Sequence, residues 1–107
     1  MNKQRISSAR IIQLAPNEIF VFGSNLQGQS YAIPTMQGGV ETIKPFVDDF
    51  LQFSFEHGEL DFLVTEIGCG IAGFSPLEIA PLFFPAIDEN MWNVYLPGSF
   101  YEVYERW

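Results

Sequence analysis

The amino-acid sequence predicts an α/β fold, a mixed β-sheet covered by helices, in one domain spanning residues 1–107. Three observations support this. The length fits a single domain, hydrophobic residues make up 48% of the chain with eleven Phe, and strand-like and helix-like segments alternate in the second half. Residues 1–9 form a polar N-terminal segment and residues 98–107 an aromatic C-terminal tail.

The first half of the chain predicts three short strands. RIIQL at 10–14 is the first, and the continuous apolar run IFVF at 19–22 is typical of a strand buried on both faces. SYAI at 30–33 is the third, and Pro34 ends it.

A helix is predicted from Thr42 to Glu56 because its apolar residues recur at spacings of three and four. Pro45 falls in its first turn, where a missing N–H is tolerated. The remaining elements are a strand at 61–67, a helix at 76–87, a strand at 92–96, and one or two helical turns in 100–107.

The first candidate binding segment is glycine-rich and lies between a strand and a helix. Glycines let a backbone approach a ligand closely with its N–H groups turned inward, and a helix start suits an anion. Ser75, Pro76 and Glu78 have the spacing of a capping box. The alternative is a tight connection that needs glycine only for packing. The segment consists of Gly68, Cys69, Gly70, Ile71, Ala72, Gly73 and Phe74.

The second candidate segment is Gly23-Ser24-Asn25, which follows the strand at 19–22. An Asn at a strand end can hold a ribose hydroxyl, and the two preceding amides can donate hydrogen bonds. The alternative is a plain turn, because Gly, Ser and Asn are all common turn residues.

Several strings of this sequence resemble an uncharacterised family of bacterial and phage-associated proteins with a macro-domain-like fold. The strings are VFGSN, SYAIPT, ETIKPFVDDF, VTEIGCGIAGF and NVYLP, within residues 18–97. The resemblance implies a minimal three-layer architecture and, more distantly, the ADP-ribose site of macro domains. Glu18 would then contact the base, Asn25 a ribose, and the amides of residues 69–73 a phosphate. In that family about 30 residues usually follow the Asn, whereas here only Leu26–Gln29 separate Asn25 from SYAIPT.

Charge restricts the partners. Five basic and thirteen acidic residues give a net charge of −8, which argues against duplex nucleic acid and disfavours polyanionic ligands. No apolar run is long enough to cross a membrane, and the polar N-terminus has no secretory signal. We therefore expect a cytoplasmic protein without a membrane partner.

Other reactive groups are few. Cys69 and His57 are the single thiol and the single imidazole, and a nucleophile–base pair of the two is a minor hypothesis. Glu66, at the end of the strand at 61–67, is a better candidate for an acid or a ligand contact. We expect no metal and no cofactor, since no suitable cluster or fingerprint is present.

The leading hypothesis is a small macro-like domain that binds a nucleotide or ADP-ribose-type molecule, with hydrolysis not indicated. The alternative is a non-enzymatic protein-interaction module that keeps the fold and has lost the pocket. The short connection after Asn25, the few basic residues and the aromatic tail favour this alternative. A hydrolase that depends on Cys69 is the third hypothesis.

Overall fold

The computed structural model describes residues 6–7, 16–22, 30–70 and 72–107 of the chain. The predicted strand at 10–14, the segment Gly23-Ser24-Asn25 and Ile71 therefore lie outside the described residues. The elements are β1 Ile6–Ser7, β2 Glu18–Phe22, β3 Ser30–Ala32, α1 Val40–Glu56, β4 Asp61–Val64, α2 Pro76–Ile79, the 3₁₀ turn η1 Ala80–Phe83, α3 Phe84–Asp88, β5 Val94–Pro97 and α4 Gly98–Arg106.

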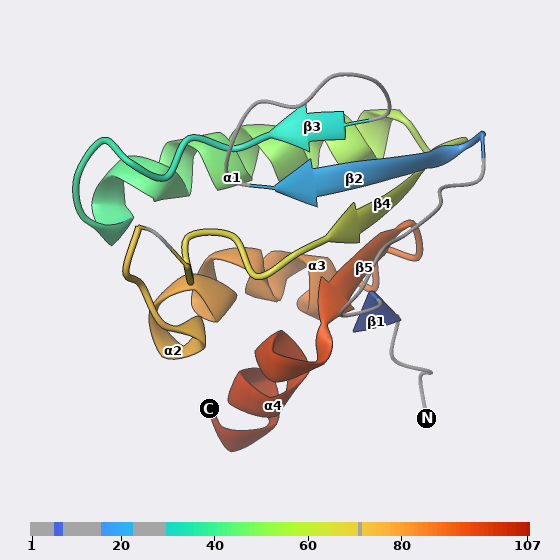
Figure 1. Ribbon diagram of the computed structural model, residues 1–107. Coiled ribbons are helices and arrows are strands. Elements are labelled where there is room, and N and C mark those ends of the chain that lie inside the picture. The colour runs from blue at the N-terminus through green and yellow to red at the C-terminus, as the bar shows by residue number, and fades with distance from the viewer. Residues whose placement is uncertain (1–5, 8–15, 23–29, 71) are drawn as a thin grey trace.

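The strands form one sheet in the order β1-β5-β4-β2-β3, and all four pairings are parallel (Figure 1). The α/β class is confirmed, but the mixed sheet is wrong among the described strands. The pairing of β2 with β3 explains the error. Residues 23–29 alone connect these two strands, whereas a crossover between parallel neighbours normally takes a dozen or more residues.

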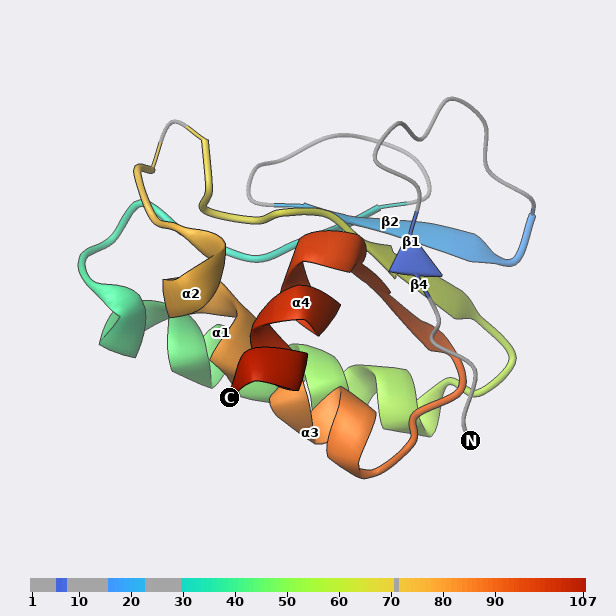
Figure 2. The same ribbon diagram turned by 90° about the horizontal axis from the view of Figure 1, so that it is seen from below.

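The described helices all lie on one side of the sheet, which Figure 2 shows edge-on. The described part of the chain therefore has two layers, where the sequence and its resemblance predicted three. The β2–β3 connection, residues 23–29, is shorter than the crossover that usually carries a helix between parallel neighbours.

The core fills the space between the sheet and the helices. Phe50 of α1 packs edge-on against Phe62 of β4 with ring centroids 5.5 Å apart, and Phe83 lies 5.6 Å from Phe100 of α4. All four rings are fully buried. Burying a Phe side chain contributes about 1.5–3 kcal/mol, so this aromatic column holds α1, β4, η1 and α4 together.

The boundaries of α1 depend on turns at its two ends. α1 begins at Val40, two residues before the predicted start, because Gly39 serves as its N-cap and accepts a hydrogen bond from the Thr42 amide. Pro45 consequently lies beyond the first turn. The predicted end at Glu56 is confirmed.

The segment predicted as one helix at 76–87 is three short helical pieces. Pro81 and Pro85 lie inside it, and each lacks the N–H that a continuous helix would need. The C-terminal tail is a helix, α4, and its residues Phe100, Tyr101 and Val103 are buried. It is therefore part of the core.

The strands also differ in extent from their predictions. β4 ends at Val64, although Thr65 still donates both its amide and its hydroxyl to the Val21 carbonyl. β5 begins at Val94 rather than at 92. β1 lies within the polar segment 1–9, in which no strand was predicted.

Candidate functional site

The glycine segment leaves the sheet at the edge where β2 and β4 end together. Gly68 and Gly73 have positive φ angles of 76° and 85°, in the region that favours glycine. A Cβ on Gly68 would lie 3.2 Å from Phe74 and 3.4 Å from Ile79, whereas a Cβ on Gly70 would meet nothing within 4 Å. Gly70 does not have a positive φ. Backbone geometry therefore requires glycine at 68 and 73 and not at 70.

Several amides of this segment already have partners within it. The Cys69 amide donates to the Glu66 carbonyl, the Gly73 amide to the Gly70 carbonyl and the Phe74 amide to the Gly68 carbonyl, over 2.8–3.1 Å. The amides of Gly70 and Ala72 donate to no backbone carbonyl of a described residue. Only part of the expected phosphate cradle is therefore available to a ligand.

The start of α2 is occupied by a carboxylate of the chain itself. One oxygen of Glu78 accepts hydrogen bonds from the amide and the hydroxyl of Ser75, at 3.0 and 3.3 Å. This confirms the capping box that the sequence predicted. An anion at this point would have to displace that carboxylate or lie beside it.

The environment of Cys69 is unfavourable for a thiolate. Burial, and then the negative charges of Glu66 and Glu78, raise the pKa of the Cys69 thiol to about 11. The thiol donates to the Ile67 carbonyl at 3.6 Å. At neutral pH the group is a neutral thiol, which is a poor nucleophile.

The hypothesis of a Cys69–His57 pair is wrong, because the two residues lie at opposite ends of β4. His57 caps the end of α1 before β4 begins, and Cys69 follows the strand. His57 contacts Glu59, with 3.3 Å between Nδ1 and Oε2, and stacks on Phe53 with ring centroids 4.2 Å apart.

Two predicted acidic site residues also lie apart from each other. Glu18 begins β2 and is paired in register with Asp61. Four residues of strand, about 13 Å at 3.3 Å per residue, separate it from the strand end that leads toward the glycine segment. Glu66 lies beside that segment, but its carboxylate accepts a hydrogen bond from the Ser99 hydroxyl, 2.5 Å away in the first turn of α4.

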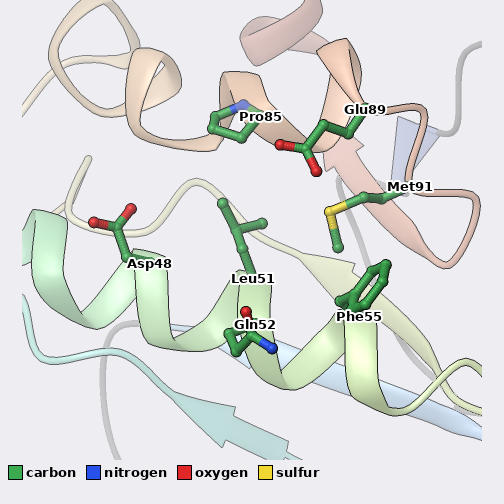
Figure 3. Close-up of a pocket in the computed structure, with 7 residues that line it drawn as sticks. All are labelled: Asp48, Leu51, Gln52, Phe55, Pro85, Glu89 and Met91. Atoms are coloured by element: carbon green, nitrogen blue, oxygen red, sulfur yellow. The ribbon is translucent and has the colours of Figure 1, made fainter.

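A groove lies elsewhere, between α1 and the α3 region, and has a volume of about 300 Å³. Four of its residues belong to α1 at the spacing i, i+3, i+4, i+7, which places them on one helix face. Figure 3 shows the side chains of the two walls facing each other across the gap. The lining residues are Asp48, Leu51, Gln52, Phe55, Pro85, Glu89 and Met91.

Among the apolar residues that line this groove, Phe55 is exposed, at 73%, whereas Leu51 is buried. The groove was not predicted, because the sequence prediction for this helix recognised a single apolar stripe. A signal was available, since Phe55 does not continue the stripe of Val47, Phe50 and Ser54 that faces the sheet. Its apolar side chain belongs to a second helix face.

Other kinds of site find less support. Within residues 6–7, 16–22, 30–70 and 72–107, no group of three or more His, Cys, Asp or Glu side chains is arranged to hold a metal ion. No described helix combines the length and apolar character needed to cross a bilayer.

Comparisons with protein-family models, curated proteins and solved structures gave no match. The macro-domain resemblance therefore stays a prediction from the sequence.

Proposed function

We propose that this protein is a non-enzymatic interaction module, and that the groove between α1 and the α3 region is its docking surface. The observation that carries the proposal is Phe55, a large apolar side chain left 73% exposed in a groove that Leu51 and Met91 also line. Exposed apolar groups clustered in a concave surface are typical of protein-binding sites.

The chemistry around the glycine segment supports the same proposal. Its thiol is protonated, and carboxylates of the chain lie at the starts of both neighbouring helices, α2 and α4. These charges oppose the binding of a phosphate. The thiol of Cys69 and the imidazole of His57 lie at opposite ends of β4 and cannot act as a nucleophile–base pair.

A selection experiment tests the proposal. A displayed library of helical peptides is sorted on the parent protein and on the variant Phe55→Ser. We expect the recovered peptides to lose about tenfold or more in affinity for the variant, because a central apolar anchor commonly contributes more than 1 kcal/mol.

The matched control is Leu77→Ser in α2, which removes another exposed apolar side chain (66% exposed) outside the groove. Both substitutions are at exposed positions and should change stability by about 0.5 kcal/mol or less. Peptides that bind the parent, Phe55→Ser and Leu77→Ser proteins equally well would overturn the proposal.

A nucleotide or ADP-ribose-type ligand at the glycine segment is the second candidate. It is favoured by the open space at Gly70 and by the amides of Gly70 and Ala72, which have no backbone partner among the described residues. Calorimetric titration with ADP-ribose, AMP and NAD distinguishes the two. Heat at millimolar ligand that disappears in Gly70→Val would establish this second function and place its site at the segment.

A further inference from the structure

Resting on the proposed docking function, we infer that the partner of the groove is a basic amphipathic helix. Its apolar side chains would pack between Leu51 and Met91 and over Phe55. Its Lys or Arg side chains would face the carboxylates of Asp48 and Glu89.

The form follows from the way the groove is built. On α1 its lining runs from Asp48 to Phe55, two helical turns or about 10 Å at 1.5 Å per residue. The spacing i, i+3, i+4, i+7 is the one through which helices pack against each other. A helix of the partner that lies in the groove, along α1 and facing Pro85, would present its apolar side chains at the matching spacing.

The charge expected of the partner follows from the acidic side chains in the two walls of the groove. Asp48 lies on the α1 wall and Glu89 on the opposite wall, so an occupant has a carboxylate on either side (Figure 3). No hydrogen bond or ion pair joins the Glu89 side chain to another described residue. Asp48 pairs with Lys44 at 2.8 Å, but both side chains are at least half exposed, so this pair is weak and exchangeable.

The whole chain strengthens this preference. Its net charge of −8 attracts basic partners over a distance and repels acidic ones. The same charge disfavours an anionic membrane surface and a second copy of this chain as occupants. A basic helix satisfies both the apolar floor and the acidic walls of the groove.

The test uses peptides recovered in the library selection, each synthesised in two forms that share the apolar positions. One form carries Lys at the positions flanking the apolar face and the other carries Glu. Binding is measured by fluorescence anisotropy to the parent protein, to Glu89→Lys in the groove, and to Glu102→Lys. Glu102 is an exposed residue of α4 outside the groove, so its variant changes the net charge equally.

We expect the Lys form to bind the parent at least about tenfold more tightly than the Glu form, and to weaken as salt is raised. Glu89→Lys should weaken the Lys form about fivefold or more, and Glu102→Lys less than about twofold. Equal binding of the two forms, or equal effects of the two substitutions, overturns the inference.

The outcomes also separate this inference from the proposed function. If both peptide forms bind equally and both are lost in Phe55→Ser, the groove is a docking surface and the charge preference is refuted. If no peptide depends on Phe55, the docking function and the inference fail together.

Discussion

Replacing each described glycine of residues 68–73 with Ala tests whether the backbone conformation requires glycine at that position. Gly68 combines a φ of 76° with a crowded Cβ position, Gly73 has a φ of 85° with free space around it, and Gly70 has neither constraint. The three substitutions add the same methyl group in three different environments. The loss of unfolding free energy should therefore be largest at Gly68, smaller at Gly73 and absent at Gly70.

The magnitudes follow from the geometry. A positive φ costs a non-glycine residue about 1–2 kcal/mol, and a crowded methyl adds about 1 kcal/mol. Replacing Gly by Ala also stabilises the fold by about 0.4–1 kcal/mol, because the unfolded chain loses entropy. We therefore expect Gly68→Ala to lose about 2 kcal/mol and Gly73→Ala about 1 kcal/mol, and Gly70→Ala to gain about 0.5 kcal/mol.

Urea unfolding followed by circular dichroism measures these differences at constant slope. In a thermal scan, each kcal/mol corresponds to about 4 °C for a domain of this size. If Gly70→Ala destabilises the protein as much as Gly68→Ala, the geometric account of the segment is refuted. If all three substitutions leave stability unchanged, glycine is not required there by the fold.

Three further outcomes are expected. Because the pKa of the Cys69 thiol is raised to about 11, iodoacetamide should modify it at pH 8 roughly ten- to a hundredfold more slowly than an exposed thiol; a rate equal to that of free cysteine would contradict the burial. The thiol's contribution to stability should be complete below its ordinary pKa and should decline as pH rises toward 11, and Cys69→Ser should remove this decline. Asn93→Ala should cost about 1–3 kcal/mol of unfolding free energy in urea, since the Leu60 carbonyl loses the Asn93 amide as its donor, whereas the Ser54 and His57 carbonyls keep the backbone amides of His57 and Leu60. Asn93→Asp should cost at least as much as Asn93→Ala, and a loss below about 0.5 kcal/mol in either variant would show that the amide is dispensable.

Asn93 shows where prediction from the sequence stops. The sequence placed it inside a strand at 92–96. In the structure its side-chain amide is buried and donates to the carbonyls of Ser54, His57 and Leu60, at 2.9–3.2 Å. Asn93 thereby joins the end of α1 to the turn before β4 and to the start of β5. Such a long-range role has no local signal, which is why the predicted strand began too early.

Elements that can be recognised from their own stretch of sequence were predicted well. β2 is an apolar run, and the buried stripe of α1 runs from Ile43 to Ser54, about three turns. The break in the helix at 76–87 was readable from Pro81 and Pro85 and was overlooked. The direction of β3 was not readable, because residues 23–29 form a connection shorter than parallel neighbours usually have.

The candidate site depended on pairings that a single segment does not reveal. The sequence placed the glycine segment correctly between a strand and a helix, and it identified Ser75 and Glu78 as a capping box. The sequence did not show that Ser99 would bring α4 to Glu66. The groove was harder still, since its two walls are about 40 residues apart in the chain and meet only when α1 and α3 pack.

The placement of carboxylates underlies two proposals, that the glycine segment binds anions weakly and that the groove binds a basic partner. Helix starts and free amides at the strand ends of a parallel sheet attract anions because they carry partial positive charge. Here Glu78 already occupies the start of α2, and Glu66 lies against the first turn of α4. The favourable field at that edge is therefore used to stabilise the fold. The carboxylates of Asp48 and Glu89 in the groove do not cap the start of a helix. They border the apolar surface around Phe55. We therefore propose that the same excess of carboxylates disfavours phosphate at the glycine segment and favours a basic partner at the groove.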